Sequence, residues 1–280
     1  MIRVGICLVP FNTSYAECRE AALATEAAGF ESLWTWDHLI SFNDDAEPVL
    51  ECWTTLAALA ELTERVKLGS FVTNVMSRHP DVLAKAIATI QEISGGRVEL
   101  GIGAGSRPRE QVAYNRPFPS GRERVERVEE AVEVMRLLWS GEEVDYQGKH
   151  YRVRGGRSVP VPSPMPPIMV AGLGPRSARN AARVGDGWNC EGLKGWTEGA
   201  DSKFYRLKPL VLEELERQGK RRESFEISVS EDLDQRFLQD PIGNIARAEE
   251  EGIDRVVLDV YAPFDLEAIR TAGKALYGRR

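Results

Sequence analysis

Histidine is the side chain to consider first for proton chemistry, and this chain of 280 residues contains three of them. His38 stands directly after Asp37, at the end of a short β-rich run. An imidazole titrates near neutral pH, so His38 could accept or donate a proton during a reaction. The alternative is a buried histidine that only satisfies a backbone carbonyl. His38 is therefore a candidate acid–base residue.

Two glycine-containing turns are candidates for holding a phosphate group. Glycine lets a ligand approach the backbone closely, and backbone N–H groups beside a helix start favour anions. A helix is expected from Ser177, just after the second turn. Glycines that merely turn a strand into a helix are the alternative, and neither turn has the Gly-x-Gly-x-x-Gly spacing of dinucleotide-binding folds. The two turns comprise Gly103, Ala104, Gly105 and Ser106, and Ala171, Gly172, Leu173 and Gly174.

Several common catalytic patterns are missing from the sequence. There is no His-x-His or His-Glu-x-x-His pair for a metal, no Gly-x-Ser-x-Gly turn for a hydrolase and no Gly-Lys-[Ser/Thr] phosphate loop. His79 precedes a proline at an expected helix start, so we interpret it as structural, and we expect His150 to face solvent. The sequence predicts no metal site.

Eight β-rich runs alternate with amphipathic segments, which is the number of units in a (β/α)₈ TIM barrel. An open doubly wound sheet also alternates, but it usually has fewer strands and an early glycine fingerprint. We therefore predict a single TIM-barrel domain over residues 1–280, with a hairpin-like excursion at residues 141–167 between the fourth and fifth strands. The expected strands are 3–9, 31–35, 66–72, 98–103, 168–171, 187–190, 225–230 and 255–260, and the expected helices are 16–28, 52–64, 82–93, 122–139, 177–184, 204–218, 242–251 and 266–276.

In such barrels the active site lies at the carboxyl ends of the strands. The Asp37–His38 pair and both glycine-containing turns fall at those ends. The barrel would therefore bring a proton-transfer group and two phosphate-holding turns to one face of the molecule.

The charge and the apolar content of the chain restrict the classes of partner that it could bind. The 36 Lys and Arg residues against 43 Asp and Glu give a net charge of −7, so we expect no nucleic-acid partner. No apolar run approaches the roughly 20 residues that a membrane span needs, and no signal-peptide pattern or cysteine pairing motif occurs. We expect a soluble cytoplasmic protein, and a homodimer through the apolar helix at residues 53–62 and the helix at residues 82–93.

Several stretches resemble the luciferase-like monooxygenase superfamily, and in particular its branch that uses the deazaflavin coenzyme F420. They occur in family order along nearly the whole chain, so the resemblance does not depend on one motif. These stretches are residues 29–38 (GFESLWTWDH), 65–73, 78–80 with 83–85, 94–97 with 100–105, 138–141, 170–176 and 185–189.

The resemblance implies roles for individual residues. It makes His38 the catalytic base and Glu110, which matches a glutamate of many members, a second catalytic residue that serves as the fallback polar partner. Ser106 stands where glucose-6-phosphate dehydrogenases of this branch carry an acid, so that substrate is not expected. A bulge, often with a non-proline cis peptide, would back the deazaflavin ring. The implied cofactor-binding residues are Asp37, Phe71, Val72, Thr73, the eight residues of the two turns, and Lys194.

Three functions follow from this resemblance. The leading hypothesis is an oxidoreductase that transfers a hydride between coenzyme F420 and an unidentified small organic substrate. The first alternative is an FMN-dependent monooxygenase of the same superfamily, because the phosphate turns would serve either cofactor. The second is a flavin- or deazaflavin-binding protein without catalytic activity, because the acid expected at Ser106 is missing.

Overall fold

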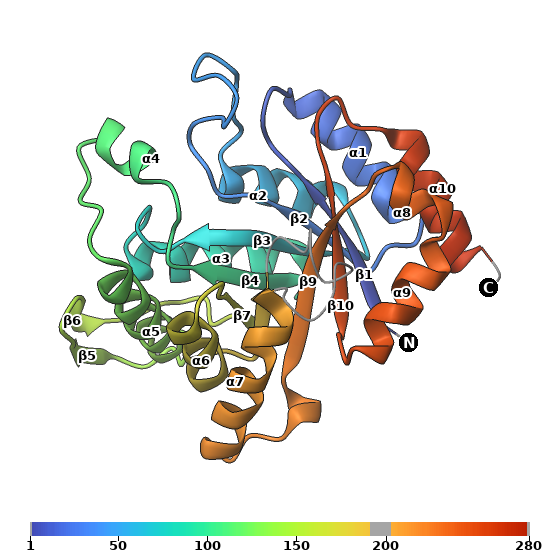
Figure 1. Ribbon diagram of the computed structural model, residues 1–280. Coiled ribbons are helices and arrows are strands. Elements are labelled where there is room, and N and C mark those ends of the chain that lie inside the picture. Colours follow the sequence, from blue (N-terminus) through green and yellow to red (C-terminus); the bar gives the residue numbers. More distant parts are fainter. Residues whose placement is uncertain (1, 191–202, 279–280) are drawn as a thin grey trace.

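The computed structural model describes residues 2–190 and 203–278. Within these ranges, eight parallel strands close into a barrel with the order β1-β10-β9-β8-β7-β4-β3-β2 (Figure 1). The predicted TIM barrel is therefore confirmed. The barrel strands are β1 (Arg3–Leu8), β2 (Ser32–Thr35), β3 (Lys67–Asn74), β4 (Val98–Gly103), β7 (Ile168–Ala171), β8 (Gly187–Cys190), β9 (Glu226–Asp232) and β10 (Arg255–Val260).

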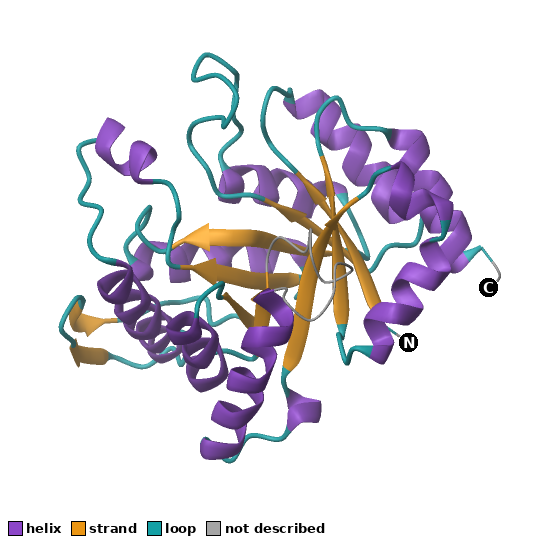
Figure 2. Cartoon of the chain, in the orientation of Figure 1, coloured by secondary structure: helices purple, strands orange, loops and turns teal. Residues whose placement is uncertain are grey.

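Helices surround the strands, as Figure 2 shows. Each of the eight expected helices is present, with its ends within a few residues of the expected positions. Two short helices without a clear amphipathic period, α4 and α8, were not expected. The helices are α1 (Tyr15–Ala27), α2 (Cys52–Leu62), α3 (Pro80–Ser94), α4 (Pro108–Ala113), α5 (Gly121–Leu138), α6 (Pro175–Val184), α7 (Lys203–Arg217), η1 (Arg222–Ser224), α8 (Gln235–Gln239), α9 (Pro241–Glu250) and α10 (Leu266–Tyr277).

The expected excursion forms a small antiparallel sheet outside the barrel. It consists of β5 (Val144–Gln147) and β6 (Arg152–Gly156). Its turn packs on α5, where the Glu130 carboxylate accepts the N–H groups of Lys149, His150 and Tyr151 at 2.9 to 3.0 Å. The excursion therefore packs on the outer helix α5.

Alternation along each strand divides the apolar side chains between two regions. A large cluster fills the space between the strands and the helices. A smaller one inside the barrel contains Cys7, Trp34, Phe71, Met169 and Val257, which come from five different strands. This inner cluster, called the floor cluster below, lies inside the barrel, and Phe71 of the cluster also lines the cavity at the carboxyl ends of the strands.

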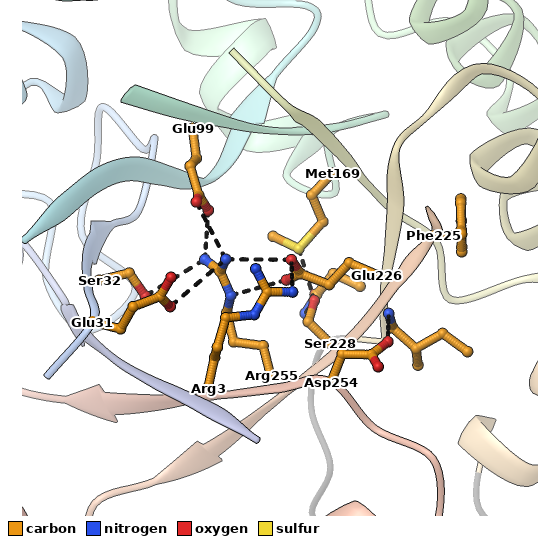
Figure 3. Close-up of polar contacts among 12 residues, drawn as sticks. Arg3, Glu31, Ser32, Glu99, Met169, Phe225, Glu226, Ser228, Asp254 and Arg255 are labelled. Carbon is orange, nitrogen blue, oxygen red and sulfur yellow. Dashed lines mark hydrogen bonds and ion pairs between the residues drawn. The ribbon is translucent and has the colours of Figure 1, made fainter. Parts of the chain in front are cut away.

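The amino ends of the strands are joined by charged side chains (Figure 3). Arg255 is fully buried, and its guanidinium lies 2.5 Å from the Glu99 carboxylate and 2.9 Å from that of Glu226. Arg3 donates to Glu226 at 2.6 Å. These residues belong to β10, β4, β9 and β1, so the network links four strands at the end opposite the candidate site.

Among residues 2–190 and 203–278, no helix combines the length and the apolar character that crossing a bilayer would require.

Candidate active site

A cavity of about 500 Å³ opens at the carboxyl ends of β2, β3, β4 and β7, which are neighbours in the barrel. This volume lies within the range of small-molecule sites, roughly 300–1,000 Å³. Except for Lys194, which lies outside the described residues, every residue expected to bind a cofactor lines the cavity, and so does His38. These lining residues are Asp37, Phe71, Val72, Thr73, Gly103, Ala104, Gly105, Ser106, Ala171, Gly172, Leu173 and Gly174.

His38 and Glu110 are joined at this cavity. The Nδ1 atom of His38 lies 3.0 Å from Oε2 of Glu110, which comes from the short helix α4. Oε1 of Glu110 accepts the backbone N–H groups of Leu39 at 2.6 Å and Ile40 at 3.1 Å. Glu110 therefore holds the segment that follows β2 by its backbone as well as by the imidazole.

The charge state of Glu110 decides the tautomer of His38. Burial would raise the pKa of the Glu110 carboxyl, but the hydrogen bonds from His38, Leu39 and Ile40 outweigh it and lower the pKa. An ionised carboxylate accepts hydrogen bonds only, so Nδ1 of His38 carries the proton. In the neutral imidazole the lone pair then lies on Nε2, the atom that Glu110 does not contact.

Asp37 is buried beside the cavity and bound to a neighbouring arginine. Its two oxygens accept hydrogen bonds from the guanidinium of Arg78 at 2.6 and 2.8 Å, and Oδ2 also accepts the N–H of Asn74 at 3.0 Å. Arg78 pairs with Glu51 at the start of α2 as well. Burial opposes the charge of Arg78, but these two acids prevail and raise its pKa. Asp37 thus ties the end of β2 to the end of β3.

The expected bulge is present in β3. The pairing of β3 with β4 shifts between Ser70 and Thr73, and the Phe71–Val72 peptide bond is cis. Phe71 is buried in the floor cluster, whereas Val72 is half-buried and lines the cavity. The Thr73 hydroxyl donates to Ser70 at 2.7 Å and accepts from Trp53 at 3.0 Å. The Thr73 side chain therefore holds the bulge in place from within the fold.

The turn between β7 and α6 has room only for glycine at its first glycine position. A Cβ atom on Gly172 would lie 2.7 Å from the backbone carbon of Ser177 and 2.8 Å from the nitrogen of Ala178. At Gly174 a Cβ would meet only the Ser177 hydroxyl oxygen, at 3.8 Å. The Ser177 hydroxyl closes the turn through the N–H of Gly174 at 3.1 Å. The first turn of α6 therefore packs directly on the Gly172 backbone.

The other two histidines lie away from this cavity. His79 precedes α3 and makes no side-chain capping hydrogen bond, and its Nδ1 lies 2.6 Å from Asp81. The expectation that His150 faces solvent was wrong: its side chain is 5% exposed and its Nε2 lies 3.3 Å from Glu126. The reason is that the hairpin turn packs against α5, which a local polar pattern does not indicate.

Most of the chain matches one known protein family. The family described as luciferase-like monooxygenase matches residues 2–230. The chain belongs to this family. Among its relatives, an F420-dependent hydroxymycolic acid dehydrogenase of Mycobacterium tuberculosis is 40% identical over 168 residues, which is 60% of this chain and 46% of the relative. An F420-dependent glucose-6-phosphate dehydrogenase of Nocardia farcinica is 36% identical over 226 residues, or 78% of this chain and 66% of the relative.

This member of the luciferase-like monooxygenase family thus spans about half to two thirds of the length of those relatives. Its fold is that of solved structures with lower identity. An F420-dependent secondary alcohol dehydrogenase superposes with a TM-score of 0.87 at 20% identity, covering 100% of this chain and 99% of the other. An F420-dependent tetrahydromethanopterin reductase of Methanopyrus kandleri gives 0.77 at 19% identity, covering 98% and 97%.

Sequence reasoning missed two groups of residues around the cavity of this family member. Phe11 and Phe42 pack near His38, with the Phe42 ring centroid 4.6 Å from the imidazole centroid. The arginines Arg122, Arg124 and Arg176 line the cavity from the starts of α5 and α6. The alternating charges at the start of α5 are typical of a solvated face, and such a pattern carries no information on which loop lies beside the helix start.

Proposed function

We propose that this protein is an oxidoreductase that transfers a hydride between coenzyme F420 and a small organic substrate. The observation that carries the proposal is the His38–Glu110 contact of 3.0 Å, placed beside a cavity of suitable size. The names of the relatives that share 36–40% identity favour coenzyme F420 over FMN. When bound, the deazaflavin would supply the hydride chemistry, and the protein would supply orientation and proton transfer.

His38 is the proton-transfer residue in this proposal. Its Nδ1 proton is held by the Glu110 carboxylate, so Nε2 is the atom that accepts a proton from a substrate or returns it. Because Glu110 acts through the imidazole and does not line the cavity, we assign it as a positioning residue. An ionised Glu110 also stabilises the imidazolium that forms when His38 takes a proton.

The residues around the cavity fit a flat, three-ring cofactor with a charged tail. Val72 at the β3 bulge, together with Val125 and Leu173, gives it apolar lining. The lining at the two glycine-containing turns includes four glycines, so main chain makes up much of the surface there. Exposed N–H groups of such turns suit a phosphate. Gly103, Ala104, Gly105, Ser106, Ala171 and Gly174 would complete this cradle.

Titration of the purified protein with each cofactor tests the proposal. Coenzyme F420 is expected to bind at micromolar concentration, detected through the change in its fluorescence, and FMN is expected to bind more weakly. Tight FMN binding without coenzyme F420 binding, together with oxygen consumption in the presence of a flavin reductase, would instead support the FMN-dependent monooxygenase.

The acid missing at Ser106 also motivates a protein that binds the cofactor without turnover. The His38–Glu110 pair argues against it, because a proton-transfer residue and its orienting carboxylate are both in place. Firm coenzyme binding with no hydride transfer between the coenzyme and any alcohol, aldehyde or sugar substrate would favour this second alternative.

We further propose that residues 1–280 act as one cytoplasmic domain and form a homodimer. The apolar residues of α2 that motivated the dimer, such as Trp53 and Leu56, are buried in their own barrel. Exposed apolar side chains lie instead on α3, at Val82 and Ile93, and in the segment before β7, at Val159. Lys85 of α3 donates to the Val159 carbonyl at 2.6 Å, which joins the two parts. Light scattering at micromolar concentration should give twice the chain mass of 31.2 kDa, and a monomer mass would contradict the proposal.

A further inference from the structure

The lining of the cavity contains more positively charged than negatively charged side chains. The chain as a whole carries a net charge of −7. The lining nevertheless contains three arginines, Arg122, Arg124 and Arg176, and a single acid, Asp37. That acid is already paired with Arg78 at 2.6 Å. The three guanidinium groups therefore have no opposite charge within the lining itself.

The arginines lie toward one side of the cavity. In the barrel the order of the neighbouring strands is β2, β3, β4 and β7. His38 follows β2, Arg122 and Arg124 are on α5, which follows β4 in the chain, and Arg176 follows β7. A ligand whose reacting end lies at His38 would thus extend past the glycine-containing turns toward the arginines.

Arg124 is fixed in place and supports this side of the cavity. Its Nε donates to the Ala104 carbonyl at 3.1 Å, its Nη1 donates to the Pro119 carbonyl at 2.6 Å, and it stacks 3.9 Å from the centre of the Phe118 ring. It therefore connects the turn after β4 to the start of α5. Beside it, Arg122 and Arg176 are the exposed guanidinium groups of the lining.

Arg122 and Arg176 are exposed and oriented by little else. Arg122 is 72% exposed, and its Nε donates a hydrogen bond to Glu126 at 2.9 Å. Arg176 is also exposed, and within residues 2–190 and 203–278 it takes part in no hydrogen bond or ion pair. Guanidinium groups in such positions suit carboxylates, which they can bind through two parallel hydrogen bonds.

We propose that Arg122 and Arg176, supported by Arg124, form a subsite for the carboxylates of the glutamate tail of coenzyme F420. This inference rests on the proposed function. The coenzyme carries a phosphodiester followed by glutamate residues, whereas FMN ends at its phosphate. The backbone N–H groups of the turns can serve one phosphate, so the arginines provide for the additional negative charges. The subsite would thereby distinguish the coenzyme from FMN and from shorter forms of itself.

The experiment compares dissociation constants for three ligands by fluorescence titration. They are coenzyme F420 with several glutamates, the form that ends at the phospholactate, and the deazaflavin that lacks both phosphate and tail. The protein should bind the form with several glutamates about three- to tenfold more tightly than the phospholactate form. High salt should remove most of this preference, because exposed ion pairs are screened.

Variants identify the residues responsible. The double variant Arg122→Gln and Arg176→Gln should lose the preference for the glutamate tail and bind the tail-free deazaflavin as the unmodified protein does. Arg154→Gln is the matched control, because Arg154 is an exposed arginine on β6 outside the cavity. The control should keep the preference. Melting temperatures should agree among all three proteins, since both cavity arginines are exposed.

The outcomes separate this inference from the proposed function. Equal binding of all tail lengths by the unmodified protein would refute the subsite and leave the proposed function standing. An equal loss in the double variant and in Arg154→Gln would refute it too, since only the net charge would then matter. Failure of all three deazaflavins to bind would refute the proposed function itself.

Discussion

The Nδ1 atom of His38 lies 3.0 Å from the Glu110 carboxylate, although the two residues are 72 positions apart in the chain. The same carboxylate holds two backbone N–H groups just after His38. One buried acid therefore sets the position, the tautomer and the charge environment of the imidazole. A substitution at Glu110 should therefore alter the orientation and the tautomer of His38.

Replacing His38 with alanine should reduce turnover by roughly 10²- to 10⁴-fold, the usual contribution of a general acid or base. Coenzyme affinity and melting temperature should stay close to those of the unmodified protein. All three quantities are measured on one preparation. Unchanged turnover in the folded, coenzyme-loaded variant would exclude His38 from the mechanism.

Glu110→Gln should lower kcat between about 10-fold and 10⁴-fold with little change in KM. The glutamine oxygen can still accept the N–H groups of Leu39 and Ile40. Its amide nitrogen would then face Nδ1 of His38 and favour the tautomer with the proton on Nε2. The pH–rate profile should change shape as well. A variant that only lost stability would keep the profile of the unmodified enzyme.

The acid stability of the fold should also depend on Glu110. Its pKa in the folded protein is lowered from the ordinary value of 4.5. The stabilisation is therefore complete above that value and is lost as the pH falls toward the lower folded pKa, because the unfolded chain binds the proton first. Melting curves recorded below about pH 5 should show a steeper loss for the unmodified protein than for Glu110→Gln. Parallel curves would contradict this assignment.

Gly172→Ala should weaken coenzyme binding and lower the melting temperature. The new Cβ would lie 2.7 to 2.8 Å from backbone atoms of Ser177 and Ala178, so the start of α6 would have to shift. Gly174→Ala is a control in the same turn, since its Cβ would meet only a hydroxyl oxygen at 3.8 Å. The two proteins are compared by coenzyme titration and thermal melting. Equal behaviour of both would show that α6 does not need close contact with Gly172.

Arg78→Met should destabilise the protein by about 3–5 kcal/mol, the usual cost of leaving a buried charge without its partner. Asp37, whose side chain is 1% exposed, would keep only the N–H of Asn74. Arg109→Met removes the exposed pair with Asp45 and should cost less than about 1 kcal/mol. Urea unfolding measures both free energies. Similar small losses would mean that Arg78 does not support the site.

The barrel could be predicted because each of its strands and helices has a local pattern of apolar residues. The runs that became β1, β4 and β10 alternate with helices of ordinary length, and eight such units indicate one architecture. His38 could be predicted for the same reason, since it directly follows a strand. The bulge at Phe71–Val72 was expected only through the family resemblance, because no propensity indicates it.

The partners of these residues could not be predicted from local pattern. Glu110 is on α4, a helix of six residues that is too short to show a period, and its contact with His38 joins two loops. Arg78 reaches Asp37 across neighbouring strands for a similar reason. The place of Arg122 at the cavity could not be predicted either, because a sequence shows which helix a residue belongs to and not which cavity lies beside it.

The charge network at the amino ends of the strands has a consequence for how this scaffold can evolve. Arg255 holds β10, β4 and β9 together at the end of the barrel away from the cavity. The alignment of these three strands therefore does not depend on the loops at their carboxyl ends. Insertions and replacements there can accumulate while the barrel stays folded. Substrate specificity can thus change through mutations in these loops while the barrel itself is kept.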